Sequence, residues 1–412
     1  MRTAVVSFHS SPLHEPGSGD AGGMTVYVRE LARSLAGRGV RTDIFTRATA
    51  PDEDVVVVHP GVRIVPIVAG PTELLAKEEL ARHLGAFAAG IMEFARGQSA
   101  TYDLIHSHYW QSGLAALELR RRWSVPLVHS HHTLGKVKNR FLAPGDEPEP
   151  QARLRGETQV ISGADVLVAS TDEEQDLLSG LYGAPHERLK TLPPGVDHST
   201  FHPGDRAAAR RRVGLGDEAV VLYVGRIQKL KGIDLALRAV EQLTHALERP
   251  VRFLIVGGAS GSHGDEETTR LRSLVDRLGL TPQVEFVGPR QHDELPDFYR
   301  AADAVVVCSH SESFGFAALE AHACGTPVVG TAVGGLSHIV RDGVSGFLVG
   351  SRDETEFAGR LKTILGDAAL WSRFSGAALE AAQIFSWERS ADEFLSLYDC
   401  LVRERLPEIC TC

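Results

Sequence analysis

The chain has 412 residues, of which 43% are hydrophobic and 23% are charged, and its formal net charge at pH 7 is −10. This acidic balance argues against nucleic acid or an anionic membrane as the main partner, although a few local cations can still bind one phosphate. The length favours two domains over one hydrophobic core. The chain contains no run of about 18 apolar residues, so no transmembrane helix is expected.

Residues 1–8 form a short apolar run that is typical of a first strand, whereas a signal peptide needs a longer apolar region and a small-residue cleavage site. The cysteines show no framework spacing and their number is odd, at five. We therefore expect a cytoplasmic protein with reduced thiols. Cys410 and Cys412 could be a metal or redox pair, but a frayed tail is the simpler interpretation.

Short β-branched runs alternate with longer amphipathic segments along the chain. The first series of predicted strands covers residues 4–8, 42–46, 103–107, 126–129 and 166–170. The second series covers residues 220–224, 252–256, 283–287, 304–308, 327–330 and 346–349. Helix-like segments include residues 24–38, 233–248, 266–278 and 314–323. This alternation predicts an α/β fold of two doubly wound parallel sheets with helices on both faces.

Proline and glycine are dense in residues 192–197 and 201–205, which places a domain boundary near residue 195. The predicted domains are residues 1–195 and 196–385, and a helical segment at about 386–412 crosses back onto the first domain. Ligands bind beyond the carboxyl ends of the strands in such sheets. Two facing domains therefore predict a cleft lined by the loops that follow strands.

The first such loop covers residues 11–24 and ends in Gly22 and Gly23 at a predicted helix start. Glycines let backbone N–H groups approach an anion, and the helix start adds partial positive charge. Residues 17–22 also fit the G-x-G-x-x-G dinucleotide fingerprint. The strand ends several residues before the loop glycines, however, and the acid expected at the end of the next strand is missing, because Asp43 stands near its start. A plain structural turn is a further interpretation.

The second loop, residues 224–232, also follows a strand and precedes a helix. Arg226 and Lys231 can both point into a cleft, where two cations suit a diphosphate. Isolated basic loop residues are usually solvated, but glycines bracket this loop at a strand end, which favours phosphate binding.

The third and most specific segment is residues 309–321. Glu312 and Glu320 are eight residues apart with a glycine turn between them, so one stands at a helix start and the other two turns later. Glu320 can accept hydrogen bonds from both hydroxyls of a ribose. The ordinary preference of acidic residues for helix N-termini is the competing explanation.

Histidines crowd two strand ends, at His106 and His108 and at residues 129–132. A metal site is one interpretation. Sugar binding is favoured because the histidines alternate along strands and so face opposite ways.

Taken together, these motifs resemble glycosyltransferase family 4, whose members are retaining enzymes of the GT-B fold. The resemblance rests on Glu312 and Glu320 around residues 313–315, on Arg226 with Lys231, on Gly22 with Gly23, and on residues 194–197 and 385–388. It covers nearly the whole chain.

The resemblance implies a nucleotide-sugar donor and neither cofactor nor metal. Catalysis is assigned to four residues, Arg226, Lys231, His132 and Glu312. The implied donor-binding residues are Gly22, Gly23, Arg226, Lys231, Arg290, Glu312, Ser313, Phe314, Gly315, Phe316 and Glu320. The acceptor attacks the face from which the phosphate leaves, and the leaving phosphate takes the proton. The sequence does not fix the donor base, and a homodimer is plausible.

Within the family, the chain looks most like members of the mycothiol pathway that transfer N-acetylglucosamine from UDP-N-acetylglucosamine to 1D-myo-inositol 3-phosphate. The implied acceptor-binding residues are Thr25, Lys77, Tyr109, Thr133 and Arg153, with Arg155 able to replace Arg153. Thr25 departs from the family, which has Asn there, and Thr cannot offer both amide groups.

Three alternatives remain open. Antibiotic-pathway relatives use other donors and acceptors, including a GDP-octose and ergothioneine. A nucleotide-sugar epimerase would isomerise its donor without an acceptor. A dinucleotide-binding oxidoreductase would need the acid that is missing after the second strand.

Overall fold

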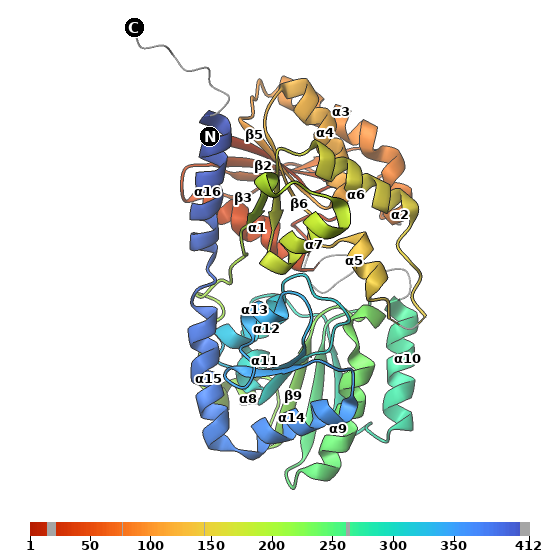
Figure 1. Ribbon diagram of the computed structural model, residues 1–412, viewed down its shortest axis with the longest axis vertical. Coiled ribbons are helices and arrows are strands. Elements are labelled where there is room, and N and C mark those ends of the chain that lie inside the picture. Colours follow the sequence, from red (N-terminus) through yellow and green to blue (C-terminus); the bar gives the residue numbers. More distant parts are fainter. Residues whose placement is uncertain (15–21, 76, 144, 261–263, 404–412) are drawn as a thin grey trace.

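The structure is a computed structural model that describes residues 1–14, 22–75, 77–143, 145–260 and 264–403 (Figure 1). The side chains of Lys77 and Glu78 also lie outside the description. Two sheets, each with its own helices, form the two halves of the molecule, called here the first and the second domain. Two Rossmann-like domains were predicted, and the arrangement confirms that fold class.

The first domain contains an eight-stranded sheet in the order β3-β4-β2-β1-β5-β6-β7-β8. Its strands are β1 (Arg2–Val6), β2 (Arg41–Arg47), β3 (Val56–His59), β4 (Val62–Ile67), β5 (Leu104–His108), β6 (Leu127–Ser130), β7 (Val166–Ala169) and β8 (Leu189–Thr191). The paired strands are parallel except at the edge, where β3 and β4 are antiparallel. This hairpin was not expected from the sequence; it turns at Pro60 and Gly61, where Gly61 has φ +88°.

Helices cover both faces of this sheet. They are α1 (Gly23–Ala36), α2 (Lys77–Leu80), α3 (Leu84–Gly97), α4 (Trp110–Trp123), α5 (Gly135–Arg140), α6 (Gln151–Gly163) and α7 (Asp172–Tyr182). Helices α3 and α4 bury one apolar cluster against the sheet, and α1 buries another on the opposite face. The polar loops after β1, β5, β6 and β7 are therefore free to face the second domain.

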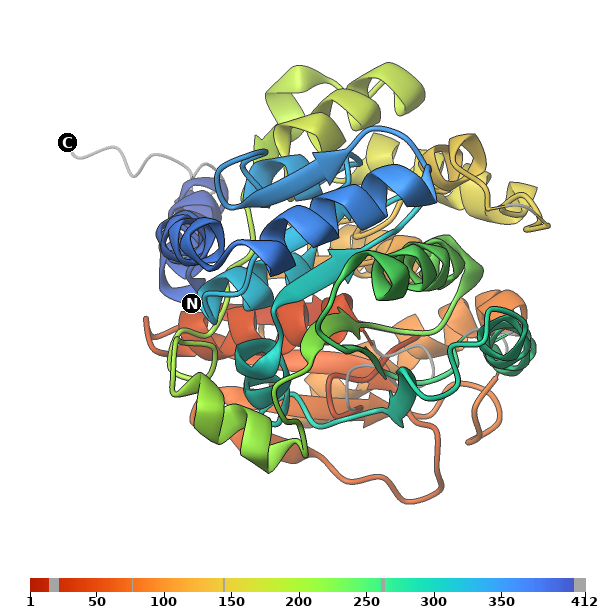
Figure 2. The same cartoon turned by 90° about the horizontal axis from the view of Figure 1, so that it is seen from below.

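The second domain contains a six-stranded parallel sheet in the order β11-β10-β9-β12-β13-β14. Its strands are β9 (Ala219–Val224), β10 (Val251–Val256), β11 (Val284–Gly288), β12 (Ala304–Val307), β13 (Val328–Thr331) and β14 (Gly346–Val349). Its helices are α8 (Arg206–Arg212), α9 (Ile233–Ala246), α10 (Gly264–Arg277), α11 (Leu295–Ala301), α12 (Phe316–Ala323), α13 (Leu336–Ile339), α14 (Glu354–Gly366) and α15 (Ala368–Ala382). They pack on both faces, as the view from below shows (Figure 2).

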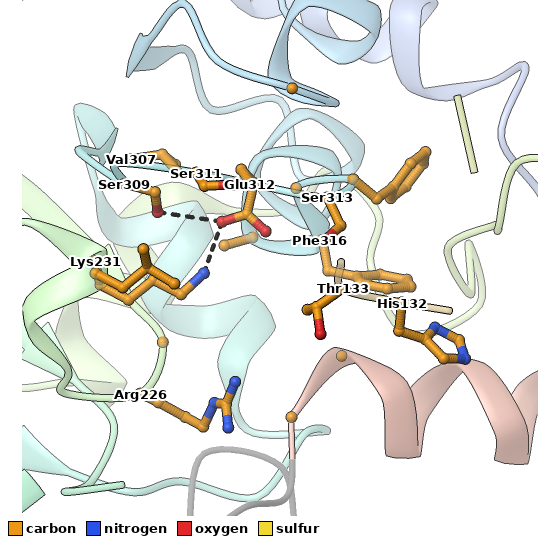
Figure 3. Close-up of a pocket in the computed structure, with 18 of the residues that line it drawn as sticks. His132, Thr133, Arg226, Lys231, Val307, Ser309, Ser311, Glu312, Ser313 and Phe316 are labelled. Atoms are coloured by element: carbon orange, nitrogen blue, oxygen red, sulfur yellow. Dashed lines mark hydrogen bonds and ion pairs between the residues drawn. The ribbon is translucent and has the colours of Figure 1, made fainter. Parts of the chain in front are cut away.

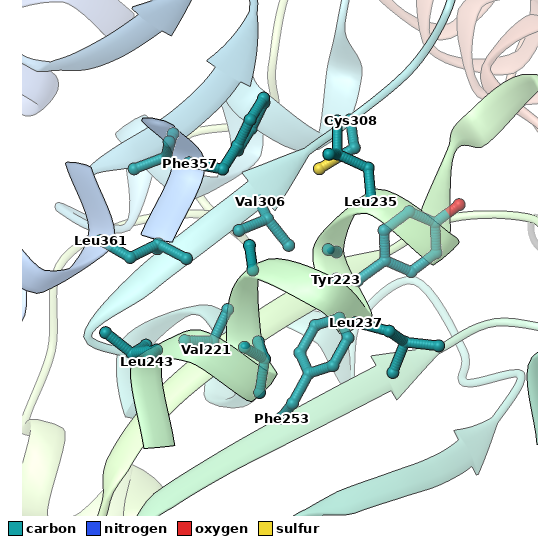
Figure 4. Close-up of a cluster of buried hydrophobic side chains, with 14 of the residues drawn as sticks. Val221, Tyr223, Leu235, Leu237, Leu243, Phe253, Val306, Cys308, Phe357 and Leu361 are labelled. Carbon is teal, nitrogen blue, oxygen red and sulfur yellow. The ribbon is translucent and has the colours of Figure 1, made fainter. Parts of the chain in front are cut away.

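One of these two cores lies between the sheet and helices α9 and α14 (Figure 4). Val221 and Phe253 point from the sheet toward Leu237 and Leu243 of α9, and Phe357 of α14 is also fully buried. Burying side chains of this size contributes about 1.5–3 kcal/mol each. This packing fixes β9 and β12, whose ends carry the second-domain loops singled out from the sequence.

The last helix, α16 (Trp387–Arg403), returns to the first domain and lies beside α1 (Figure 1). Its buried residues Trp387, Phe394 and Tyr398 pack in the same cluster as Tyr27 of α1. The predicted crossover helix is thus confirmed as far as Arg403. The rest of the predicted segment, with Cys410 and Cys412, lies outside the described residues.

Five histidines occupy β5, β6 and the residues that follow β6: His106, His108, His129, His131 and His132. Rings two residues apart lie side by side, with centroids 4.1 Å apart for His106 and His108 in β5 and 4.3 Å apart for His129 in β6 and His131 just after it. The expectation that neighbouring histidines face opposite ways therefore fails within each pair, because side chains at i and i+2 point to the same side of a strand.

Burial keeps these five imidazoles neutral. It lowers the pKa of His106, His131 and His132 to about 3 and lowers the pKa of His108 and His129 well below the ordinary value. Hydrogen bonds join some of them to neighbours, since Nδ1 of His106 lies 2.7 Å from the Tyr398 hydroxyl and Nδ1 of His129 lies 2.7 Å from that of Ser107.

The depressed histidine pKa values predict acid sensitivity of the fold. In the unfolded chain a histidine binds a proton below about pH 6.5, but in the folded chain it does so only near pH 3, so its full contribution is present above pH 6.5 and is lost as the pH falls. Each such group can contribute about 1.4 kcal/mol per pH unit in that window. Urea unfolding should give a steeply lower free energy at pH 5 than at pH 8. Equal free energies at both pH values would contradict this prediction.

Candidate functional site in the interdomain cleft

A cavity of about 460 Å³ lies between the two domains and is lined by residues from both (Figure 3). Most of the residues proposed from the sequence line it: Gly22, Gly23, Tyr109, His132, Thr133, Arg153, Arg226, Lys231, Arg290, Glu312, Ser313, Phe314, Gly315, Phe316 and Glu320. They come from the loops that follow strands in both sheets. The carboxyl ends of the two sheets thus meet at one site, as expected for facing doubly wound domains.

The start of α1 comes very close to the second domain. A Cβ atom on Gly22 would lie 3.2 Å from Nε of Arg226, and one on Gly23 would lie 2.8 Å from Cδ2 of Phe316. Since Gly22 has an extended backbone with φ −160°, glycine is needed here for space and not for its dihedral angles. The first turn of α1 and its N–H groups can therefore border the cavity. The fingerprint residues 17–21 lie outside the described part of the chain.

Two of the residues proposed to bind the acceptor, Thr25 and Lys77, are not among those described as lining the cavity. Thr25 is 2% exposed, and its hydroxyl donates to the Gly22 carbonyl at 2.7 Å, so it closes the first turn of its own helix and is absent from the described cavity lining. Lys77 begins α2, and its side chain lies outside the description.

The two cations of the β9 loop already have partners. Nζ of Lys231 donates to Oε2 of Glu312 at 2.7 Å, and the Ser309 hydroxyl lies 3.2 Å from the same oxygen (Figure 3). Nη1 of Arg226 lies 3.4 Å from the Ser260 hydroxyl. An anion entering the cavity would therefore compete with Glu312 for Lys231.

Helix α12 begins at the cavity. Its N-cap, Gly315, has φ +104°, a conformation that other residues rarely adopt. The side chain of Phe314 is 3% exposed and packs in the core, so this residue offers only its backbone to a ligand. Free N–H groups at the start of the helix favour an anion or a sugar oxygen there.

Glu320 stands one turn into α12 and is 6% exposed. Its two carboxylate oxygens accept hydrogen bonds from the Tyr299 hydroxyl at 2.7 Å and from Nε2 of His292 at 2.8 Å. Burial opposes the charged imidazolium, but the Glu320 carboxylate outweighs it and raises the pKa of His292. His292 was not expected from the sequence, although it lies two residues after Arg290 in the same strand-end loop.

A second charged cluster lines the first-domain side of the cavity. Arg153, 4% exposed, donates from Nη2 to the Thr133 hydroxyl at 2.9 Å and lies 5.1 Å from the centre of the Tyr109 ring. Its Nε donates to Glu157 at 2.7 Å, and its Nη1 lies 2.9 Å from Glu149. Three of the five residues expected to bind the acceptor, Tyr109, Thr133 and Arg153, are thus brought together.

The structure separates Arg153 from Arg155, which the sequence left as interchangeable. Arg153 faces inward from α6, whereas Arg155 is exposed and is absent from the described lining. The structure also adds Lys138 to the residues on the acceptor side, because Lys138 lines the cavity and pairs with Glu149. That pairing links residues of α5 and of the loop before α6, so no local sequence pattern reveals it.

Tyr109 and His132 have unusual backbones for residues other than glycine, with φ +73° and +60°. Both follow neighbouring strands, β5 and β6, and both line the cavity. Such strain persists only where the surroundings hold it, and it gathers at functional sites.

Among the described residues, no group of three or more histidine, cysteine, aspartate or glutamate side chains is arranged to hold a metal ion. None of the described helices combines the length and apolar character needed to cross a bilayer.

Comparison with known proteins agrees with this geometry. Residues 205–380 match the family described as glycosyl transferases group 1, and residues 22–195 match the glycosyl transferase 4-like domain. The D-inositol 3-phosphate glycosyltransferase of Geodermatophilus obscurus is 49% identical over 409 residues, covering 98% of this chain and 90% of that protein. The protein of the same name from Mycobacteroides abscessus is 50% identical over 411 residues, covering 99% of this chain and 91% of that protein.

Solved structures show the same fold. The sucrose-phosphate synthase of Thermosynechococcus elongatus superposes with a TM-score of 0.91 at 33% identity, covering 98% of this chain and 99% of that one. WaaG, a glycosyltransferase involved in lipopolysaccharide biosynthesis, superposes with a TM-score of 0.73 at 17% identity, covering 97% of this chain and 99% of that one.

The close approach of α1 to Phe316 predicts that a methyl group added at Gly23 lowers the free energy of unfolding. Gly23→Ala places a Cβ 2.8 Å from the Phe316 ring and should destabilise the protein by about 1 kcal/mol, near the low end of overpacking because a ring can shift. Phe316→Leu in the same chain should recover most of this loss. Gly97→Ala, which meets nothing within 4 Å at the end of α3, is the matched control and should be neutral or stabilising. Equal losses for both alanine variants in urea unfolding would contradict the contact.

Proposed function

The chain belongs to glycosyltransferase family 4 and is a glycosyltransferase with the GT-B fold, and from this premise we propose that it transfers N-acetylglucosamine from UDP-N-acetylglucosamine to 1D-myo-inositol 3-phosphate. The observation that carries the proposal is that one cavity joins two cations suited to a diphosphate with a second cationic cluster suited to a phosphate. The relatives at 46–50% identity that are named as D-inositol 3-phosphate glycosyltransferases support this choice of acceptor.

On the donor side, Arg226, Lys231 and the start of α1 hold the diphosphate. Lys231 exchanges Glu312 for the diphosphate, and the Glu312 carboxylate can then accept a hydrogen bond from a hydroxyl of the sugar. Arg290 borders the nucleotide, and the N–H groups at the start of α12, with Ser313, contact the sugar. The ion pair between Lys231 and Glu312 holds both side chains in place until the donor arrives.

Glu320 holds the ribose. Each of its oxygens already accepts one hydrogen bond, from Tyr299 or His292, and each retains a second lone pair for a ribose hydroxyl. Tyr299 and His292 thereby fix the carboxylate in one orientation.

The reaction needs no protein nucleophile. As the bond between sugar and phosphate breaks, negative charge grows on the leaving diphosphate, and Arg226, Lys231 and the α1 N-terminus stabilise it. The acceptor hydroxyl attacks from the face that the phosphate leaves, and the phosphate takes its proton, so the anomeric configuration is retained. His132, neutral because its pKa is lowered to about 3, borders the sugar ring.

On the acceptor side, Arg153, Thr133 and Tyr109 bind the phosphate, with Lys77 completing the set. The donors of Arg153 that face Thr133 and Glu149 are occupied in this structure, so the phosphate takes the place of the Glu149 carboxylate. A dianionic phosphate competes for Arg153 better than a neutral or singly charged group does.

A second candidate acceptor follows from Thr25. Because its hydroxyl closes the first turn of α1, it offers the acceptor no counterpart to the family's Asn side chain. An antibiotic-pathway acceptor with a different pattern of polar groups is the alternative that this position favours.

Incubation with UDP-N-acetylglucosamine and 1D-myo-inositol 3-phosphate, followed by mass spectrometry, tests the proposal. An N-acetylglucosaminyl inositol phosphate product with matching UDP release supports both substrates. UDP binding without product would be consistent with a glycosyltransferase but would reject this acceptor. Isomerisation of the donor sugar with no acceptor present would favour an epimerase.

Lys231→Ala should lower kcat by about 100-fold or more, because it removes one of the cations that stabilise the leaving diphosphate. The circular dichroism spectrum should change little, and the Tm should fall only modestly, since Lys231 lies at the cavity wall and Glu312 keeps the Ser309 hydroxyl as a partner when the ion pair is lost. Lys229→Ala is the matched control two residues earlier, where Nζ donates to the Gly145 carbonyl at 3.2 Å, and it should retain near-normal kcat. Near-normal turnover of the Lys231 variant would reject its diphosphate role.

Arg153→Lys should raise the acceptor KM about tenfold or more while the donor KM stays constant. Lysine keeps the positive charge that buried Glu157 needs but loses the planar fork that contacts Thr133 and Glu149. Arg155→Lys on the exposed side of α6 is the control and should leave both the acceptor KM and the donor KM unchanged. A rise in the donor KM instead would show that Arg153 was assigned to the wrong substrate.

A further inference from the structure

We propose that His108 is a positioning residue for the transfer reaction, because it holds the His132 ring in one orientation and one tautomer at the cavity wall. The inference rests on the proposed function, in which His132 borders the donor sugar. His108 itself is 1% exposed and is absent from the described cavity lining, so it acts through His132.

The contact between the two rings is direct. Nδ1 of His108 lies 2.9 Å from Nε2 of His132, and the ring centroids are 5.1 Å apart with planes inclined by 30°. His108 ends β5, and His132 follows the end of the neighbouring strand β6, where His108 pairs with Ser130. One hydrogen bond therefore ties together two strand-end loops that both line the cavity.

Because both imidazoles are neutral, this hydrogen bond determines which ring nitrogen of His132 is available to a substrate. A neutral ring has one N–H donor and one acceptor nitrogen, and a hydrogen bond between two neutral rings holds one proton. With Nε2 engaged by His108, the ring nitrogen of His132 left for a substrate is Nδ1. If His108 donates, Nδ1 of His132 carries the proton and donates to a sugar oxygen; if His108 accepts, Nδ1 accepts from a sugar hydroxyl.

His108 is held in turn by its own surroundings. Its ring lies against His106, with centroids 4.1 Å apart, and His106 is fixed by the Tyr398 hydroxyl at 2.7 Å and the Ser130 hydroxyl at 3.0 Å. Tyr27 meets both His108 and His132 edge-on, at 5.7 Å and 4.9 Å. The ring of His108 therefore cannot turn without displacing several buried neighbours.

The backbone of His132 gives an independent reason for such support. Its φ of +60° is unusual for a residue with a side chain and costs free energy, so surrounding contacts must hold it. The bond to His108 and the edge contact with Tyr27 are contacts of this kind. A histidine that only filled space at position 108 would leave the tautomer of His132 unspecified.

The test compares His108→Asn with His108→Phe. Asn places an amide near the position of Nδ1 and can keep the hydrogen bond, whereas Phe fills the space without it. Nitrogen-15 shifts of the His132 ring, assigned by their loss in His132→Gln, report the tautomer in the full-length protein without substrate. The wild type should show one tautomer, Asn should retain one, and Phe should give a mixture and a kcat about tenfold or more lower with the donor KM little changed.

Tyr398→Phe is the matched control, because it removes a buried hydrogen bond from His106 in the same cluster without touching His132. It should lower the Tm and leave the His132 shifts in place, because the Ser130 hydroxyl still holds His106 and the bond between His108 and His132 is untouched. Averaged tautomers in the wild type, or unchanged shifts in the Phe variant, would overturn the proposal. If the Phe variant does not fold, the shifts of the wild type and of the Asn variant still decide it. If His132→Gln retains normal kcat, the role of His132 in the proposed function falls instead, whatever its shifts show.

Discussion

The close contact at the start of α1 is the constraint on which the site depends. Gly22 and Gly23 leave room for Arg226 and Phe316, so groups from two separate sheets reach one cavity. Each domain buries its own core without the other, but neither contains the complete site. Helix α16 adds to this arrangement, because it follows the second domain in the chain and packs Trp387 and Phe394 against the first.

Charges that would bind ligand are paired with one another in the cavity. Lys231 pairs with Glu312, and Arg153 pairs with Glu149 and Glu157. Unpaired charges at such partly buried positions would be costly, so these pairs stabilise the empty site. Ligand binding then exchanges partners, and a multiply charged phosphate is the kind of group that can replace a carboxylate. This exchange is what the proposed function requires of a phosphate-bearing donor and a phosphate-bearing acceptor.

The family likeness and the geometry agree on the donor side more closely than on the acceptor side. The donor residues proposed from the sequence line the cavity, and Tyr299 and His292 add support for Glu320. On the acceptor side, the Thr25 hydroxyl donates to the backbone of its own helix. Arg153, proposed to bind the acceptor phosphate, already pairs with Glu149, which would compete with that phosphate. Acceptor choice is thus the property in which this chain has most room to differ from its relatives.

The sequence by itself determined the alternation of strands and helices, the crossover helix, and the three loops that carry Gly22, Arg226 and Glu312, because these follow from local periodicity and from glycine at strand ends. The β3–β4 edge hairpin was missed, since its valines resemble any other apolar run. Tertiary structure alone decided that Arg153 and not Arg155 faces inward, that His292 supports Glu320, and that His108 contacts His132. These choices depend on which side a helix turns and on contacts between residues distant in the chain, and local residue patterns do not specify either.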